Sequence, residues 1–169
     1  MGLLAKDVAV PESFDSAELW LRLQAALEEY RERLAGSLDG LSEEEARRSL
    51  VPSKTTLLGL VKHLTYVERF YFEHCVTGRS LKELGIASTP DRSFVLAKRD
   101  TIESVRDGYR RACEAARETV AALGPTAVVH GRGEQPVWSL HLRVLQDVAQ
   151  HCGHADILRE QLLATRTSS

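Results

Sequence analysis

The chain has 169 residues, of which 43% are hydrophobic and 27% are charged, and its formal net charge is −2. The length suits one domain, so we expect residues 1–169 to form a single unit that ends in a disordered tail at about 165–169. The charge balance provides no basic excess for a phosphate backbone, and no apolar run or signal peptide predicts membrane insertion or export. We therefore predict a cytoplasmic protein that has no nucleic-acid or membrane partner.

Two helices are predicted in the first third of the chain. Residues 16–37 repeat leucine at near-helical spacing, with Ser16 placed as an N-cap and a glycine near the end. The segment 42–48, SEEEARR, begins with Ser42 followed three residues later by Glu45, which is the pattern of a capping box. We expect a long first helix and then a short one that a proline stops.

A second long helix is predicted from an N-cap at Ser53 or Thr55 to about Val76, because an apolar stripe recurs at helical spacing. A glycine follows and ends this helix. Residues 78–97 then mix polar and apolar residues with Gly and Pro and show no clear period. We expect this segment to be an irregular crossover with a helical turn at 80–84.

The third helix is predicted to run from Asp100 or Thr101 to about Leu123, where a Gly-Pro pair stops it. A loop of residues 124–136 leads to a fourth helix that ends near Leu163. Only the Ala-Val-Val run in that loop has β-like character. We therefore predict an all-α protein, an antiparallel four-helix bundle with one long crossover.

The cysteines Cys75, Cys113 and Cys152 are far apart and form no CxxC pair. Their odd number and their spacing support neither a disulfide framework nor a zinc ribbon. Cys152 adjoins His151 but points about 100° around the helix, so it is a poor second ligand for a shared metal. We expect three free thiols that are buried or half-buried.

The strongest functional signal lies in the fourth helix, where Asp147, His151 and His154 fall on the apolar side. Residues four apart differ in direction by about 40° and lie one turn apart, so Asp147 and His151 can bind one ion. His154 can pair with His151 but lies two turns from Asp147. His63, on the inner face of the second helix, is the best candidate for the further ligand, and the small Gly59 near it would let another helix come close. Such a His, Asp, His set suits Zn²⁺, Fe²⁺, Mn²⁺ or Ni²⁺ and leaves a coordination position open.

The spacing leaves other interpretations open. His63 can instead be a hydrogen-bonded histidine of the core, and Asp147 can pair with Arg143 one turn earlier. His154 can be an alternative ligand, or it can orient a ligand through a hydrogen bond. Three further histidines are interpreted as solvated or structural: His74, His130 and His141.

Two segments resemble a known family. LLGLVKHLTYVERFYF and SLHLRVLQDVAQHCGHADILRE are similar to the DinB-like superfamily of four-helix metalloproteins, in the branch near mycothiol-dependent maleylpyruvate isomerase and the mycothiol transferases. The resemblance covers nearly the whole chain and implies a divalent metal held by His63, Asp147 and His151. Relatives in this branch usually have Glu where this chain has Asp147. The shorter side chain keeps a His151–His154 pair as a rival arrangement.

The resemblance also implies a chemistry. A divalent metal, zinc in the first place and otherwise nickel, iron or manganese, lowers the pKa of a bound low-molecular-weight thiol such as mycothiol or bacillithiol. We therefore expect a metal-dependent thiol S-transferase, which adds this thiol to a small-molecule electrophile. Separately, a compact helical bundle favours a homodimer through its helix faces. The alternatives are a hydrolase that uses water at the same metal and a non-enzymatic metal- or ligand-binding stress-response protein. No residue pattern selects the electrophile.

Overall fold

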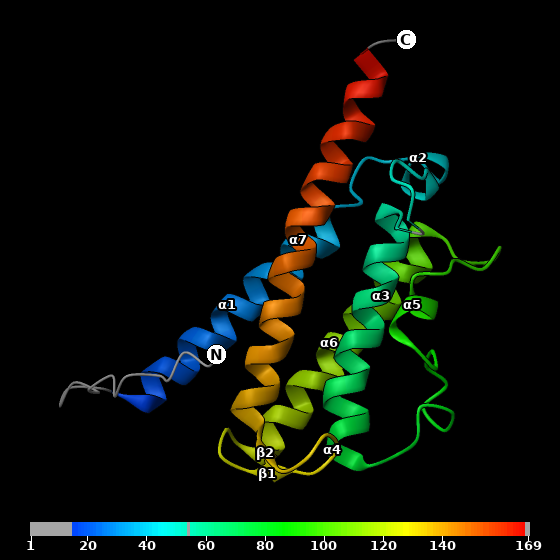
Figure 1. Cartoon of the computed structure of the whole chain (residues 1–169). Helices are drawn as coiled ribbons and strands as arrows, with labels where there is room; N and C mark the ends of the chain where they lie inside the picture. Colours follow the sequence, from blue (N-terminus) through cyan, green and yellow to red (C-terminus); the bar gives the residue numbers. More distant parts are fainter. Residues whose placement is uncertain (1–14, 54, 168–169) are drawn as a thin grey trace, which may run out of the picture.

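The computed structural model describes residues 15–53 and 55–167, which form an all-α bundle of four long helical segments (Figure 1). The predicted fold class is therefore confirmed. The elements in chain order are α1 (Ser16–Gly36), α2 (Glu43–Arg47), α3 (Leu57–Arg69), the π-helix η1 (Phe70–His74), α4 (Cys75–Thr77), α5 (Pro90–Ser93), α6 (Ile102–Leu123), β1 (Val128–Val129), β2 (Gln135–Pro136) and α7 (Val137–Thr167).

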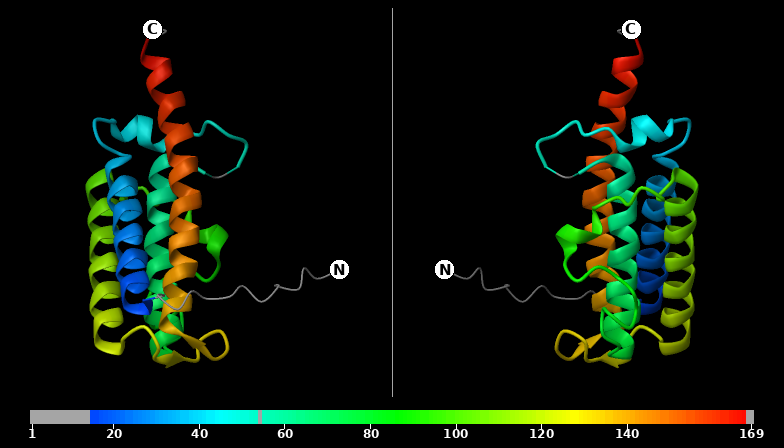
Figure 2. Two further views of the ribbon diagram at one scale, coloured as in Figure 1. Left: turned by 90° about the vertical axis from the view of Figure 1, so that its left-hand side faces the viewer. Right: turned by 90° about the vertical axis from the view of Figure 1, so that its right-hand side faces the viewer.

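The directions of the helices explain the long crossover. α1 and α7 run toward one end of the bundle, whereas α3 and α6 run toward the other end (Figures 1 and 2). α1 packs mainly on α7 and α3 packs mainly on α6, while contacts between α3 and α7 join the two pairs. Because α3 and α6 are parallel, the chain between them must return along the length of α3. Residues 78–101 make this return along α3, and in the view of Figure 1 they lie to the right of α3, whereas α7 lies to its left.

Side-chain caps begin the helices at or near the predicted positions. The capping box of Ser42 and Glu45 is present in α2, and Thr101, one of two predicted caps, begins α6. Ser16 was predicted to cap α1, but the cap is Asp15. The backbone of Asp15 is extended, whereas Ser16 is already the first residue of the helix. The Asp15 carboxylate accepts hydrogen bonds from two amide groups of the first turn, at 2.8 and 3.2 Å.

The second long helix begins later than predicted. Its cap is Thr56, whose hydroxyl accepts a hydrogen bond from the Gly59 amide at 3.0 Å. The two predicted caps, Ser53 and Thr55, instead hydrogen-bond to each other at 3.1 Å. The helix continues through η1 and α4 and ends, as predicted, at Gly78, whose φ of 73° is left-handed.

The crossover contains more structure than its sequence indicates. The predicted turn at 80–84 is present, with the Leu84 amide donating to the Ser80 carbonyl at 3.1 Å. The short helix α5, which is capped by Thr89, was not predicted. In the loop 124–136, β1 and β2 pair antiparallel, which explains the β-like run in the sequence.

The last helix is longer than predicted, because tertiary contacts hold its end. Arg166 donates hydrogen bonds to the Glu45 carboxylate at 2.6 and 2.7 Å and to the Gly40 carbonyl at 2.8 Å. α7 therefore passes Leu163 and includes the beginning of the predicted tail, whose last two residues lie outside the described part of the chain. Neither α7 nor any other described helix is both long and apolar enough to span a membrane.

The three cysteines are free and buried, as predicted. Burial raises the pKa of the Cys113 thiol to about 12 and that of Cys152 to about 11. These thiols are therefore protonated at neutral pH and serve as packing groups.

A fully enclosed ion pair joins α1 to α3. Arg31 is 4% exposed and Glu68 is 0% exposed, and two hydrogen bonds of 2.8 and 2.5 Å connect the guanidinium to the carboxylate. Burial by itself lowers the pKa of Arg31. The charge and the hydrogen bonds of Glu68 raise it by more, so the pKa lies above its ordinary value. Arg31 also donates to Glu28 at 2.6 Å. Each charge thus depends on the other, because water is excluded from both.

We predict that removing one member of this pair is more harmful than removing both. Glu68→Leu should lower the free energy of unfolding by about 3–5 kcal/mol, because it leaves a buried guanidinium undercompensated. The double variant Arg31→Met/Glu68→Leu should be more stable than this single variant when both are unfolded in urea. The exposed pair of Glu18 and Arg22 provides the control, since Glu18→Gln should cost about 0.5 kcal/mol or less. Equal stability of the single and double variants would contradict a coupled pair.

His141 was predicted to be either solvated or structural. It lies in the core, so the structural interpretation is correct. It is 4% exposed and contacts the Trp20 ring edge-on, with the ring centroids 4.9 Å apart. Neither ring nitrogen has a hydrogen-bond partner of normal geometry among the described residues. Burial, and after it the positive charge of Arg31, lowers the pKa of His141 to about 4. The ring is therefore neutral in the folded protein at pH 7.

The buried ring should make the fold sensitive to acid. Between pH 6.5 and pH 4 the unfolded chain binds a proton at His141 and the folded protein does not, so stability falls as the pH falls. We predict that the loss in free energy of unfolding from pH 7 to pH 5 is about 2 kcal/mol smaller in His141→Leu than in the wild type. The control is His130→Leu, at an exposed position. If urea unfolding shows the same pH-dependent loss in all three proteins, His141 is not the cause.

Candidate functional site

The two histidines predicted to meet across the bundle lie side by side. His63 comes from α3 and His151 from α7, and their ring centroids are 5.0 Å apart with the planes at 78°. His63 is buried and His151 is half-buried. Because α3 and α7 pack against each other, one inward-facing histidine on each helix, at the same height in the bundle, is enough to form the pair.

A serine of the crossover fixes the orientation of His63. The Ser93 Oγ atom lies 2.6 Å from His63 Nδ1 and also donates its proton to the Pro90 carbonyl. A hydroxyl has one proton, so Ser93 must accept the hydrogen bond from a protonated Nδ1 of His63. The neutral imidazole therefore carries its lone pair on Nε2, which is the atom that a metal or a substrate proton can reach.

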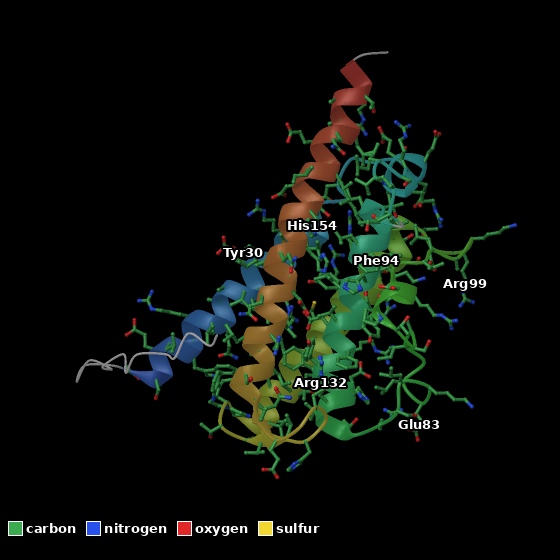
Figure 3. All side chains as sticks on the ribbon, in the orientation of Figure 1. Tyr30, Glu83, Phe94, Arg99, Arg132 and His154 are labelled. Atoms are coloured by element: carbon green, nitrogen blue, oxygen red, sulfur yellow. The ribbon has the colours of Figure 1, made fainter. Side chains whose placement is uncertain are left out.

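An aromatic ring from the same crossover covers His63. Phe94 stacks on it with the centroids 3.9 Å apart and the planes at 12°, and Phe94 also contacts the edge of His151 at 6.2 Å. Tyr66 lies 6.1 Å from His63. Figure 3 shows Phe94 beside α3 and His154 on α7, which mark the two sides of the site. These rings reduce the access of water to the imidazole.

The absence of a side chain at Gly59 makes this covering possible. A Cβ atom at this position would lie 2.7 Å from the Phe94 carbonyl oxygen and 3.0 Å from the Thr56 hydroxyl. From the sequence, we expected Gly59 to admit another helix. The segment that packs against Gly59 is instead the backbone of the crossover at Phe94, where the sequence predicted no regular structure.

Both histidines are neutral at pH 7. Burial, and then the neighbouring His151, lowers the pKa of His63 to about 4. Burial, and then the neighbouring His154, lowers the pKa of His151 to about 4. Neutral imidazole is the form that coordinates metal, so the pair is ready to act as ligands without first releasing protons.

Asp147 lies one turn before His151 and is half-buried. Burial raises the pKa of its carboxyl group, while the charges of Arg143 and Arg132 lower it. No described basic group lies within ion-pair distance of this carboxylate, so the predicted alternative of a pair with Arg143 is not formed. A half-buried carboxylate without a cationic partner is the kind of group that a bound cation would stabilise.

His154 is exposed, and its Nδ1 atom lies 3.4 Å from Nδ1 of His151. It is therefore a neighbour of His151, as the helical geometry predicted. Within residues 15–53 and 55–167, no three His, Cys, Asp or Glu side chains are close enough, as placed, to hold one metal ion. The structure thus brings His63 close to His151, and His151 close to His154. A metal site made of His63, Asp147 and His151 stays a prediction.

Three residues near the site were missed in the sequence. Ser93 and Phe94 lie in the crossover, where no period exists, although the Thr89-Pro90 pair that caps and begins α5 is a recognisable helix start. Arg132 belongs to the loop before α7, where its guanidinium lies 5.8 Å from the centre of the Phe70 ring. Figure 3 places Arg132 near the end of the bundle where α7 begins.

The other two histidines lie away from this site. The His74 Nδ1 atom is 2.6 Å from the Arg79 carbonyl oxygen, and His130 is exposed and lies 3.7 Å from Glu134. Both therefore have the solvated or structural roles that were predicted for them.

Comparison with known protein families supports the resemblance seen in the sequence. A family model described as "Mycothiol-S-transferase" matches residues 22–164, which include His63, Asp147 and His151. No protein of curated function matches the chain significantly.

The close approach at Gly59 can be tested by a matched pair of substitutions. Gly59→Ala should lower the free energy of unfolding by about 1–3 kcal/mol and increase amide hydrogen exchange at residues 93–96, because the new methyl group displaces the crossover. Gly108→Ala, in α6 where a Cβ meets nothing within 4 Å, should instead stabilise the protein by about 0.5–1 kcal/mol. Similar stabilities of the two variants would show that the crossover does not rest on residue 59.

Proposed function

The chain belongs to the mycothiol S-transferase family, and we propose that it is an enzyme that joins mycothiol, or a related low-molecular-weight thiol, to an electrophilic small molecule. The observation that carries this proposal is the pair of neutral imidazoles, His63 and His151, which two different helices bring together. A half-buried carboxylate, Asp147, lies one turn of α7 before His151. The matched family supplies the class of thiol. The site supplies the chemistry for activating it.

We further propose that the site holds a divalent metal, zinc in the first place and otherwise nickel, iron or manganese. The chemistry of the donor set fits such an ion, because two neutral imidazoles are joined by a carboxylate that no described basic group pairs with: His63, His151 and Asp147. Ser93 supports the fit, since it leaves the lone pair of His63 on Nε2. When bound, the metal lowers the pKa of a coordinated thiol, so that the thiolate is available at neutral pH.

The residues of this chain then orient the reaction. Ser93 and Phe94 hold the His63 ring in one position, and Phe94 with Tyr66 limits the entry of water that would compete with the thiol. In the transfer, the thiol loses its proton to solvent and its sulfur forms a bond with the electrophilic carbon. The bond from that carbon to the leaving group breaks, and the leaving group departs with the electron pair.

The metal proposal is tested by metal analysis of purified variants. The wild type should carry about one divalent metal per chain, and His63→Ala and His151→Ala should each remove it. His130→Ala, at an exposed position outside the site, is the matched control and should keep the metal. Comparison of Asp147→Ala with His154→Ala identifies the third ligand. Unchanged metal content in His63→Ala or in His151→Ala would contradict the proposed site.

The same preparations test the activity. Conjugation of 1-chloro-2,4-dinitrobenzene should require added mycothiol or bacillithiol and should release chloride in equal amount. The rate should fall by at least about 100-fold in His63→Ala and stay unchanged in His130→Ala. Consumption of the electrophile at an undiminished rate without any thiol would instead identify a hydrolase.

A further inference from the structure

A pocket of about 630 Å³ lies between α3, α6 and the crossover. None of its lining residues comes from α7, so it is separate from the His63–His151 site. In the view of Figure 3, His154 and the pocket residue Arg99 lie on opposite sides of α3. The two sites share two wall residues: Ser93, whose hydroxyl contacts His63, and Tyr66, whose ring lies 6.1 Å from the His63 ring. A volume of this size accommodates a small organic molecule.

Positive charge is concentrated around this pocket although the chain as a whole is slightly acidic. Five of the lining residues are basic and one is acidic: Lys62, Arg69, Arg92, Arg99, Arg111 and Asp100. The Lys62 ammonium pairs with Asp100 at 2.7 Å, and Arg69 pairs with Glu73 at 2.7 Å. The other three guanidinium groups have no carboxylate within 4 Å among the described residues.

These three arginines surround one cavity from different elements. Arg92 is on α5, Arg99 is on the crossover after it, and Arg111 is on α6. Like charges around a cavity repel one another, and a bound anion removes this cost while it forms charge-assisted hydrogen bonds. The planar guanidinium fork matches both carboxylate and phosphate oxygens.

The walls between the charges favour an organic anion over a bare ion. Tyr66, Ile86 and Val105 provide apolar surface, and Thr65 and Ser104 provide hydroxyl groups. Gly108 lines the pocket from the first half of α6, and a Cβ at this position would meet no atom within 4 Å. The pocket therefore extends to the backbone of α6.

We propose that this pocket is a second ligand site, which binds a small organic molecule with two or more carboxylate or phosphate groups. Arg92, Arg99 and Arg111 hold the anionic groups, and the apolar wall covers the carbon skeleton. This binding does not depend on the proposed thiol chemistry, because the three arginines that hold the anion make no hydrogen bond or ring contact with His63 or His151.

The test is calorimetric titration of the full chain with tricarballylate and with fructose 1,6-bisphosphate, which separate a carboxylate ligand from a phosphate ligand. At least one of them should bind saturably, and uncharged fructose should not. Arg99→Gln/Arg111→Gln should weaken the binding by at least about tenfold. Lys98→Gln/Arg110→Gln removes the same charge at neighbouring exposed positions outside the pocket and should leave the affinity within about threefold.

A second variant tests the shape of the pocket without any change of charge. Gly108→Leu fills the cavity from α6, and it should abolish the binding while circular dichroism shows a folded protein. His63→Ala should bind the anion as well as the wild type does, which separates this proposal from the thiol chemistry. Failure of both anions to bind, an equal loss in both charge variants, or full binding by folded Gly108→Leu would overturn the proposal.

Discussion

The crossover backbone rests on α3 at a position where a side chain would collide with it. The Phe94 carbonyl occupies the space that a Cβ of residue 59 would need. This contact brings Ser93 to Nδ1 of His63 and lays the Phe94 ring on the imidazole. The same segment forms a wall of the basic pocket on the other side. Both proposed sites therefore depend on how closely one irregular segment approaches one helix, and that approach requires glycine.

The core contains two kinds of polar group, and the difference between them distinguishes the candidate site from a structural ion pair. The Arg31–Glu68 pair is enclosed and mutually satisfied, so it joins α1 to α3 and has no capacity left for a ligand. The His63–His151 pair is neutral, and one turn of α7 before His151 stands Asp147, a carboxylate without an ion partner among the described residues. A polar cluster with unused donor atoms is suited to binding, whereas a saturated one is suited to structure.

Helical periodicity predicts the four long helices, and it places His63 and His151 on facing sides, because the inner face of a helix repeats at a fixed interval. The end of α7 was not predictable in this way, since Arg166 stabilises it through a contact with a distant segment. Ser93 and Phe94 were missed for the same reason: the crossover has no period, and its position is set by the surface of α3. Glu68 was missed because a charged helical residue ordinarily faces solvent, and only its pairing with Arg31 allows burial.

The central claim is that a thiol is activated by a metal held between α3 and α7. The most direct measurement is the absorption spectrum of the cobalt(II)-substituted protein during titration with mycothiol. A sulfur-to-cobalt charge-transfer band should appear and saturate at about one thiol per chain, and S-methylated mycothiol should not produce it. Binding of mycothiol to the cobalt-loaded protein without this band would contradict the account, because the thiol sulfur would then lie away from the metal.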